Sequence, residues 1–329
     1  MSINQPAPTL LGPPWPASTT LNEGIIHVGG KPITELAAQF GTPAYILDVE
    51  DLRSRARAFK EAFDNAFGYP VGVFYASKAF TSTAVLRWLT AEGLGVDCST
   101  AGELAVALAA GVDPGVIGLH GNNKSDEELT QALTAGVGRI IIDSLTEINR
   151  LARVAETLEV EHVPVMIRLT TGVHAGGHEF IATAHEDQKF GLSIASGAAK
   201  QAVEHIQAQP RLELMGLHSH IGSQILSTDG FANAARAVLE FRAELASLGI
   251  EVEEVDLGGG YGIAYLPGEA DLDPRDAANT LAAVVKDESE RLNLPPPRVS
   301  IEPGRAIVGP TMLTVYEIGT IKQVQTDNG

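Results

Sequence analysis

The segment "VGVFYASKAF" (residues 71–80) begins the repeating pattern that decides the fold. It contains an apolar, strand-like run from Val71 to Tyr75, and a lysine, Lys78, follows shortly after this run. A lysine in such a place is most often a surface residue whose stem lies along apolar neighbours. The alternative is a reactive amine held at the end of a buried strand. The organisation of the rest of the chain distinguishes the two.

Strand-like and helix-like segments alternate after this lysine. Residues 81–92 carry apolar side chains at helical spacing, and residues 93–99 ("GLGVDCS") are typical of a strand. Patterns in which Ser or Thr precedes Glu by three residues, typical of a helix start, recur at Thr100, Ser125 and Ser144. Gly111 and Gly136 follow at positions that suit helix ends. Three such units in succession predict βα repeats around a parallel sheet.

The repeats continue to a total of eight strands. They are predicted at residues 73–78, 93–99, 116–122, 139–143, 163–169, 214–222, 252–260 and 298–305. Eight strands of this kind, separated by helical stretches, favour an α/β fold of the (β/α)8 TIM barrel type over an open doubly wound sheet.

The flanking segments predict a second, mostly β domain that is incomplete in this chain. Residues 24–33 are typical of a hairpin around Gly29 and Gly30, and strands are expected at 43–48 and 312–325. The predicted division is an extended or disordered arm (1–20), N-terminal strands that pack with the second domain (21–48), the barrel (49–308), and the start of a truncated C-terminal β domain (309–329).

Composition excludes several classes of function. The chain has 329 residues and a net charge of −18, without a basic cluster, which disfavours nucleic-acid binding. No run of 18 apolar residues predicts a membrane span, and the N-terminus lacks the features of a signal peptide. The single cysteine, Cys98, excludes a disulfide framework and is typical of a cytoplasmic protein.

The carboxyl ends of the predicted strands gather polar and glycine residues. In chain order they are Lys78; Asp97, Cys98 and Ser99; Asn122 and Asn123; Asp143 and Ser144; Arg168; His218, His220 and Ser223; Gly258, Gly259 and Gly260; and Glu302 and Arg305. In a TIM barrel these ends meet at one rim, where the active site lies.

The chemistry of this set matches one cofactor. A buried lysine amine forms Schiff bases with aldehydes, and successive glycines let backbone amides approach a phosphate. An imidazole such as that of His220 can stack on a flat ring, and an acid such as Glu302 can keep a pyridine nitrogen protonated. These groups together predict a site for pyridoxal 5'-phosphate, with Lys78 as the amine.

Seven motifs in order resemble those of the pyridoxal-phosphate decarboxylases with an alanine-racemase-like barrel. They are "FYASKAF", "GVDCSTAGEL", "LHGNNKS", "HEDQKFGLS", "GLHSHIGSQI", "DLGGGYGI" and "IEPGRAIVGP". The resemblance runs from about Gly24 to the end of the chain, and "HSHIGSQ" and "GNNKS" are most similar to the diaminopimelate-decarboxylating branch.

The resemblance implies a role for each matching residue. Lys78 is the Schiff-base lysine, His220 stacks on the cofactor ring, and Glu302 pairs with the pyridine nitrogen. Ser223, Gly259 and Gly260 bind the phosphate, Arg305 contacts a substrate carboxylate, and Asp97 lies near the lysine and helps to position it.

The implied reaction is decarboxylation of meso-2,6-diaminopimelate to L-lysine, the last step of lysine biosynthesis, by a cytoplasmic homodimer. Racemases of this fold usually present an arginine to the ring nitrogen, so Glu302 favours decarboxylation. In the family, a C-terminal β domain adds a Cys-Glu pair and a tyrosine to the site, and we expect these groups to be absent here.

Several alternatives stay open at this point. The chain could be an ornithine or arginine decarboxylase, an amino-acid racemase, or a non-catalytic carrier of the cofactor. Lys189 is the rival lysine, in a long loop over residues 171–193. The same loop holds His174, His178 and His185, but the glycines between them argue against a metal site, and no metal is predicted.

Overall fold

The chain divides into two compact units in this computed structural model, which describes residues 9–173 and 189–326. The barrel unit comprises residues 53–263 and 270–309, and the terminal unit comprises residues 1–52, 264–269 and 310–329. Among the described residues, no helix combines the length and the apolar character needed to cross a membrane. The histidines of the alternative metal site (174, 178 and 185) lie outside the described residues.

The barrel unit contains a closed parallel barrel, as the repeat count predicts. Its strands, in the order in which they pair, are β6 (Gly72–Ala76), β7 (Gly95–Cys98), β8 (Ile117–Leu119), β9 (Arg139–Ile142), β10 (Val163–Thr170), β12 (Leu212–Ser219), β13 (Glu254–Asp256) and β14 (Arg298–Ile301). The ring closes because β14 pairs with β6 through Ser300 and Gly72. A short strand, β11 (Leu192–Ser193), extends alongside the end of β10.

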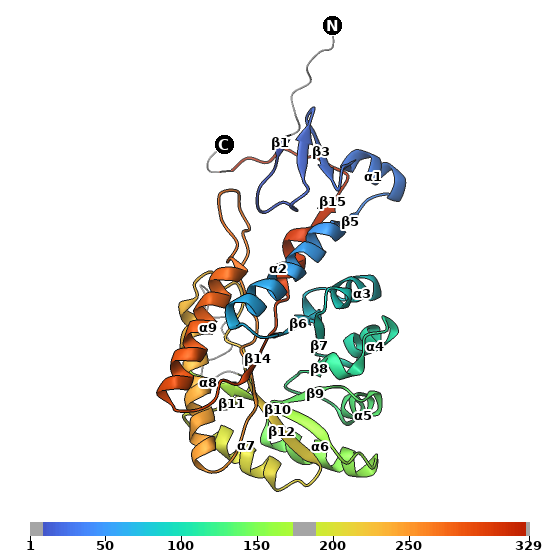
Figure 1. Cartoon of the computed structure of the whole chain (residues 1–329). Coiled ribbons are helices and arrows are strands. Elements are labelled where there is room, and N and C mark those ends of the chain that lie inside the picture. The colour runs from blue at the N-terminus through green and yellow to red at the C-terminus, as the bar shows by residue number, and fades with distance from the viewer. Residues whose placement is uncertain (1–8, 174–188, 327–329) are drawn as a thin grey trace. The chain divides into compact units, whose positions relative to one another are not determined.

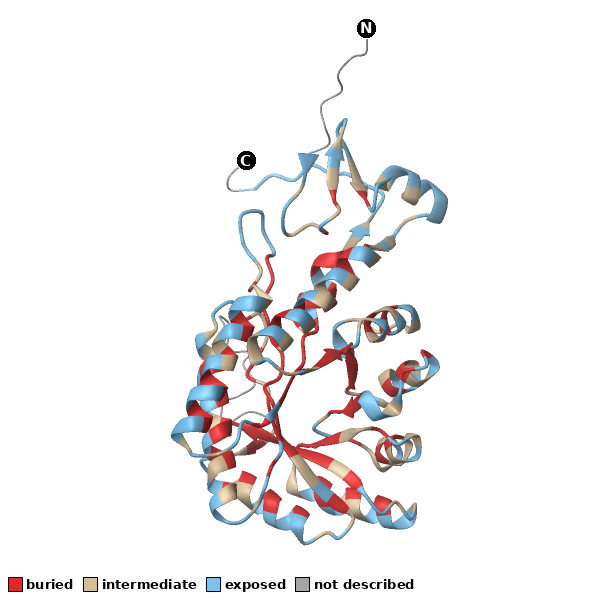
Figure 2. Cartoon of the chain, in the orientation of Figure 1, coloured by how far each residue is buried: buried red, intermediate tan, exposed pale blue. Residues whose placement is uncertain are grey.

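Helices follow the strands and cover the barrel (Figure 1). They are α3 (Thr83–Ala91), α4 (Ala101–Ala109), α5 (Asp126–Ala135), α6 (Leu145–Thr157), α7 (Ala198–Gln207), α8 (Asp229–Ser247), α9 (Pro274–Arg291) and the short α10 (Arg305–Val308). The 3-10 turns η1 (Ser77–Ala79) and η2 (Pro114–Val116) lie between them, and α2 (Val49–Phe67) precedes β6. Figure 2 shows that buried residues concentrate on the barrel strands and on one face of each long helix, as amphipathic helices around a sheet require.

The three predicted helix-start patterns form in two variants. At α5 the box is complete, because Ser125 accepts from the Glu128 amide and Glu128 accepts from the Ser125 amide. At α4 and α6 the Thr or Ser caps the helix, but the glutamate turns to an earlier amide. Glu103 accepts from Ser99, and Glu147 accepts from Asp143. These two glutamates therefore tie the ends of β7 and β9 to the helices that follow.

The terminal unit is built from short antiparallel strands and one helix. A four-stranded sheet contains β1 (Thr9–Leu10), β2 (Thr20–Asn22), β3 (Ile25–Val28) and β4 (Lys31–Pro32), and α1 (Ile33–Phe40) follows it. The hairpin between β3 and β4 turns at Gly29 and Gly30, as predicted.

A separate pair joins β5 (Ala44–Leu47) to β15 (Met312–Val315). The C-terminal strand is thus much shorter than the predicted 312–325, because regular pairing with β5 ends at Val315. The 3-10 turn η4 (Gly309–Thr311) precedes β15.

Candidate active site

Lys78 lies in the turn η1, two residues beyond the end of β6. The turn is held from both sides, since the Tyr75 hydroxyl donates to the Phe80 carbonyl at 2.9 Å and the Ser77 hydroxyl donates to Glu103 at 3.1 Å. The side chain of Lys78 is exposed, so the prediction of a buried amine is wrong. The chain holds the backbone of the lysine rigidly and leaves its amine accessible.

The loop after β14 packs against this lysine turn. The Ala76 amide donates to the Pro303 carbonyl at 3.3 Å. A Cβ added at Gly304 would meet the Ala76 side chain and carbonyl at 3.1 Å, so only glycine fits this approach without a shift. Glu302 and Arg305, which flank this Pro-Gly pair, are therefore fixed next to the turn that carries the lysine.

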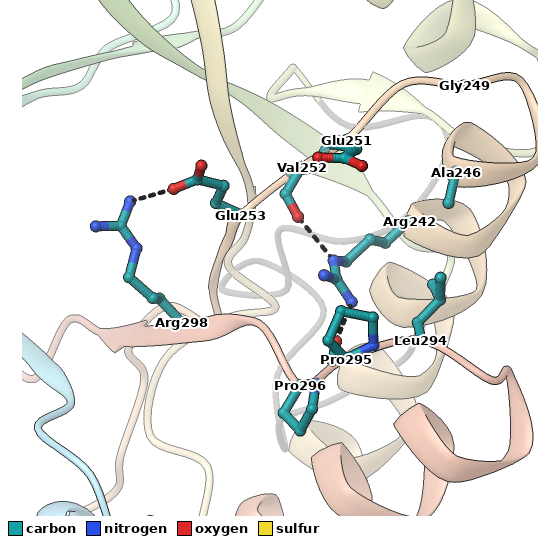
Figure 3. Close-up of a pocket in the computed structure, with 10 residues that line it drawn as sticks. All are labelled: Arg242, Ala246, Gly249, Glu251, Val252, Glu253, Leu294, Pro295, Pro296 and Arg298. Carbon is teal, nitrogen blue, oxygen red and sulfur yellow. Dashed lines mark hydrogen bonds and ion pairs between the residues drawn. The ribbon is translucent and has the colours of Figure 1, made fainter.

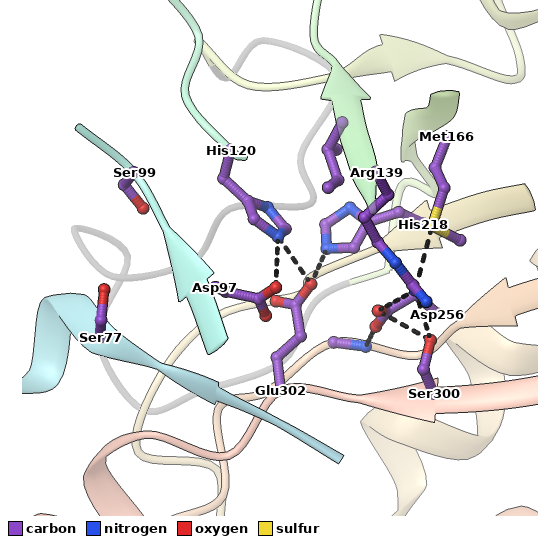
Figure 4. Close-up of polar contacts among 12 residues, drawn as sticks. Ser77, Asp97, Ser99, His120, Arg139, Met166, His218, Asp256, Ser300 and Glu302 are labelled. Carbon is purple, nitrogen blue, oxygen red and sulfur yellow. Dashed lines mark hydrogen bonds and ion pairs between the residues drawn. The ribbon is translucent and has the colours of Figure 1, made fainter. Parts of the chain in front are cut away.

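Glu302 stands among three other buried polar side chains (Figure 4). Its Oε1 atom lies 2.9 Å from Nε2 of His218 and 3.3 Å from Nε2 of His120. The same His120 nitrogen lies 3.3 Å from Oδ1 of Asp97. The two imidazole rings meet edge to face at a centroid distance of 5.2 Å. We call these four residues the carboxylate cluster.

Burial sets the charge state of this cluster. It lowers the pKa of both His120 and His218 to about 3, so both imidazoles are neutral at pH 7. Burial also raises the pKa of Glu302, and it raises the pKa of Asp97 to about 7. The contacts of the two histidines with Glu302 are therefore contacts of neutral rings with a carboxyl group, not ion pairs.

A second set of charged residues lies next to this cluster inside the barrel. Arg139 contacts Glu254 at 2.6 Å, and the Ser300 hydroxyl donates to Glu254 at 2.8 Å and to Asp256 at 2.9 Å. The guanidinium also lies over the Phe74 ring, 4.2 Å from its centroid. Burial, followed by the Glu302 charge, raises the pKa of Asp256 to about 7. We call Arg139, Glu254, Asp256 and Ser300 the interior ionic cluster.

The three glycines after β13 are required by close backbone packing. A Cβ would lie 2.3 Å from the Ser219 carbonyl oxygen at Gly258, 2.0 Å from that of Glu302 at Gly259, and 2.4 Å from that of Gly222 at Gly260. Gly258 also has a positive φ of +72°. The loop thus brings the ends of β12, β13 and β14 together.

The amide of Gly259 donates a hydrogen bond to Nδ1 of His220 at 3.2 Å. This use differs from the predicted one, in which the amide faces a phosphate. His220 is half-buried, and burial followed by the Lys78 charge holds its pKa well below the usual range. His220 and His218 are therefore separated in role: His218 lies inside the barrel against Glu302, and His220 lies at its end beside the glycine loop.

Ser223 and Arg305 form a polar pair at the same end of the barrel. The Arg305 guanidinium donates to the Ser223 hydroxyl at 3.0 Å, which joins the loops after β12 and β14. A cation beside a hydroxyl donor is a suitable arrangement for a phosphate or a carboxylate. The structure places Arg305, the predicted substrate residue, beside the predicted phosphate residue.

Other residues at the strand ends contact neighbouring parts of the barrel. Asn122 donates to the Lys189 carbonyl at 3.2 Å, and Arg168 lies 3.9 Å from Asp143 and 4.6 Å from the centre of the Phe190 ring. Lys189 itself is exposed, 5.1 Å from the same ring. Cys98 is buried, which raises the pKa of its thiol to about 12.

The prediction from sequence missed His120, Arg139 and Asp256. A signal exists for each, since His120 directly follows the apolar "IGL" of β8, and Arg139 and Asp256 are charged residues within barrel strands. Charged groups in short buried strands need partners. Which partners they find depends on the closure of the barrel.

The residues present fit pyridoxal phosphate. Oε1 of Glu302 is buried and has no hydrogen-bond partner among the described residues, and burial raises the pKa of this carboxyl. A protonated pyridine nitrogen would supply both the donor and the positive charge that this oxygen lacks. Lys78 suits the aldehyde, and the pair of Arg305 and Ser223 suits the phosphate.

The carboxylate cluster also has the composition of a metal site. One ligand atom from each of His120, His218 and Glu302 lies within 4.8 Å of the others. A metal ion there would occupy the oxygen that the pyridine nitrogen would use. Binding of the cofactor also accounts for the positions of Lys78, Ser223 and Arg305. Binding of a metal ion would account for none of these three positions.

A separate pocket has a volume of about 480 Å³, and Figure 3 shows the residues that line it. It is lined by residues that precede or begin β13 and β14, among them Glu253 and Arg298. Arg242 closes one side, where its guanidinium donates to the Val252 and Pro295 carbonyls. The pocket is not part of the candidate site, because these residues lie before the strands or at their starts, whereas the active site of a TIM barrel lies at the carboxyl ends of the strands.

Comparison with known proteins gives one family and several similar enzymes. Residues 49–309 match the family described as "Pyridoxal-dependent decarboxylase, pyridoxal binding domain". The diaminopimelate decarboxylase of Mycobacterium tuberculosis is 50% identical over 319 residues, which cover 94% of this chain and 70% of that protein. The Bacillus subtilis enzyme of the same name is 39% identical over 303 residues, 92% of this chain and 68% of that protein.

Solved structures give the same result. The diaminopimelate decarboxylase of M. jannaschii in complex with L-lysine superimposes with a TM-score of 0.87 at 30% identity, covering 94% of this chain and 71% of that one. The Helicobacter pylori enzyme, also complexed with L-lysine, has a TM-score of 0.77 at 28% identity over 85% of this chain and 68% of that one.

Proposed function

We propose that this chain, which belongs to the diaminopimelate decarboxylases, binds pyridoxal 5'-phosphate and converts meso-2,6-diaminopimelate to L-lysine and CO2. The geometric observation that carries the proposal is the placement of an accessible lysine, Lys78, beside a buried carboxyl group, Glu302, whose Oε1 has no hydrogen-bond partner among the described residues. The cofactor, when bound, supplies an electron sink for the pair released from the bond to the departing carboxylate.

Each residue then has a defined task. Lys78 would hold the cofactor through its aldehyde, and Glu302 would keep a proton on the pyridine nitrogen. Ser223 and Arg305 bind anionic groups, the phosphate and a substrate carboxylate. The neutral His220 ring would stack on the cofactor ring, and the hydrogen bond from the Gly259 amide orients that imidazole.

Asp97 acts next to this machinery. Burial raises the pKa of Asp97 to about 7, and the charges of Arg139 and then Lys78 oppose this effect. The carboxyl group itself contacts His120. We therefore expect Asp97 to influence Lys78 through its charge. The proposal further includes a cytoplasmic location and a homodimeric assembly, as in the family that the sequence resembles.

The decisive experiment is CO2 release from meso-diaminopimelate by this chain with added pyridoxal phosphate. We expect release by wild type and by Lys189→Ala, and none by Lys78→Ala. Lys189 is the matched control, because it is an exposed lysine that contacts a ring outside the cluster. The absorbance of lysine-linked cofactor should disappear in Lys78→Ala alone.

Two results would contradict the proposal. Retention of the lysine-linked absorbance in Lys78→Ala would reject Lys78 as the Schiff-base residue. Loss of optical rotation from a chiral amino acid without CO2 release would indicate a racemase instead.

A further inference from the structure

The carboxylate cluster contains two histidines that the proposed function leaves without a task. His218 is fully buried and His120 nearly so, and both direct Nε2 to the same oxygen of Glu302, at 2.9 Å and 3.3 Å. Burying two imidazoles in the centre of a barrel is costly unless their polar atoms are used. Their shared target indicates that the use concerns Glu302.

Neither contact removes the acceptor capacity of Glu302. The Nε2 atoms of His120 and His218 and the Oε1 atom of Glu302 have no aligned hydrogen bond among the described residues, although they touch. Both rings are neutral, because burial lowers the pKa of each to about 3. The two rings therefore restrict the position of the carboxyl group. Because they are neutral, they do not compensate its charge, whereas a cationic neighbour would.

The rings are themselves fixed. They meet edge to face at 71°, an arrangement that aromatic rings favour. His218 lies in β12, paired in register with Arg168 and Asp256 on the neighbouring strands. His120 follows β8, and its amide donates to the Cys98 carbonyl at 2.7 Å. Glu302 therefore contacts side chains from β12 and from the residue after β8. Neither of these strands is adjacent to β14, whose neighbours in the barrel are β13 and β6.

We propose that His120 and His218 are positioning residues that hold the Glu302 carboxylate in place for the ring nitrogen of the cofactor. This inference rests on the proposed function, because it takes Glu302 as the partner of that nitrogen. It gives the two histidines no contact with the substrate and no proton transfer. Their contribution is to restrict the motion of Glu302, which would otherwise have to be ordered when the cofactor binds.

The test compares two cofactors by equilibrium binding, followed by fluorescence or absorbance. One is pyridoxal phosphate, and the other is the 1-deaza analogue, in which C–H replaces the ring nitrogen. A residue that acts through Glu302 and the ring nitrogen matters only for the first ligand. A residue that merely supports the fold matters equally for both.

We expect His218→Ala and His120→Ala each to weaken binding of pyridoxal phosphate by up to about tenfold, the cost of ordering one side chain on binding, with the affinity for the deaza analogue unchanged. His218→Gln, which restores a neutral polar group near the same place, should recover most of the loss. His162→Ala is the control, because His162 is exposed between α6 and β10.

The outcomes separate this inference from the proposed function. If the wild-type protein bound both ligands equally, Glu302 would not be the partner of the ring nitrogen. Both the role proposed for Glu302 and the positioning role of the histidines would then be rejected. Wild type that prefers pyridoxal phosphate, with histidine variants that keep the full preference, would overturn the positioning role alone. If His218→Ala does not fold, His120→Ala and His218→Gln carry the same comparison.

Discussion

The Gly259 amide donates to Nδ1 of His220, and a Cβ at the same glycine would meet the Glu302 carbonyl oxygen at 2.0 Å. One residue therefore fixes the position of two predicted cofactor groups. Because Nδ1 accepts this hydrogen bond and the ring is neutral, the ring proton is assigned to Nε2. The glycine loop, predicted as a phosphate cradle, is also the device that aligns His220 with Glu302.

Gly259→Ala should therefore weaken cofactor binding and lower stability together. The added methyl group must displace the Glu302 backbone, and overpacking of this kind costs about 1–3 kcal/mol of the free energy of unfolding. Urea unfolding and cofactor titration measure the two effects. Gly102→Ala is the matched control, since its Cβ would meet only the Thr100 hydroxyl at 3.8 Å. Equal behaviour of the two variants would contradict the packing argument.

Ser223→Ala should reduce the affinity for pyridoxal phosphate but not for pyridoxal, which lacks the phosphate. The hydroxyl already accepts from Arg305, so its loss also frees the guanidinium from one partner. We expect a reduction of about tenfold, typical of a hydrogen bond to a charged group. Ser247→Ala, at the exposed end of α8, should change neither affinity. A parallel fall in the affinity for both ligands would place Ser223 outside the phosphate site.

Asp256→Asn should change how stability depends on pH. Its pKa is raised from 3.8 to about 7, so the native state keeps a proton that the unfolded state releases above about pH 4. The resulting contribution to stability is fully present below about pH 4 and is lost as the pH rises to about 7. The variant cannot titrate there, so its stability relative to wild type should improve between pH 4 and 7 and then stay constant.

Urea unfolding at several pH values measures this difference. His120 and His218, whose pKa is lowered to about 3, give the opposite slope, with stability lost as the pH falls below about 6.5. They are present in both proteins, so the comparison largely removes their effect. A difference that does not vary between pH 4 and 7 would mean that Asp256 is ionised throughout.

Arg139→Met should destabilise the barrel strongly. It removes the buried cation of Glu254 and leaves only the exposed Arg298 nearby, and removing one partner of a buried pair costs about 3–5 kcal/mol. The double variant Arg139→Met with Glu254→Gln should recover much of this loss, because the uncompensated charge is gone. Thermal or urea unfolding measures both.

Arg298→Met is the matched control for Arg139. Arg298 lies 3.7 Å from the other oxygen of Glu254, but its side chain is 62% exposed. An exposed pair of this kind contributes about 0–1 kcal/mol. If Arg298→Met cost as much as Arg139→Met, burial would not be the factor that makes the interior ionic cluster important.

The fold was accessible from the sequence because βα repeats are a local signal. Each strand shows as a short apolar run, and each helix start shows as a cap such as Ser125 with Glu128. The count of eight strands then limits the architecture, and the closed barrel confirms it. The C-terminal strand was overestimated, because apolar alternation after Val315 resembles a strand whether or not a partner strand pairs with it.

The site was accessible only in part. Lys78, Ser223 and Glu302 stand shortly after the ends of strands in recognisable motifs, so their arrival at one rim follows from the barrel itself. Their assigned roles stay predictions, as does the division into domains. The predicted burial of Lys78 was wrong, because side-chain exposure depends on how the turn η1 sits against the loops beside it.

The sequence by itself thus determined the order of strands and helices and which residues end each strand, since both are written in local periodicity and caps. Only the tertiary structure decided that His120 and His218 meet at one oxygen of Glu302 and that the Gly259 amide belongs to His220. These contacts join residues from different strands around a closed ring. Their geometry depends on barrel closure and register, which no local pattern specifies.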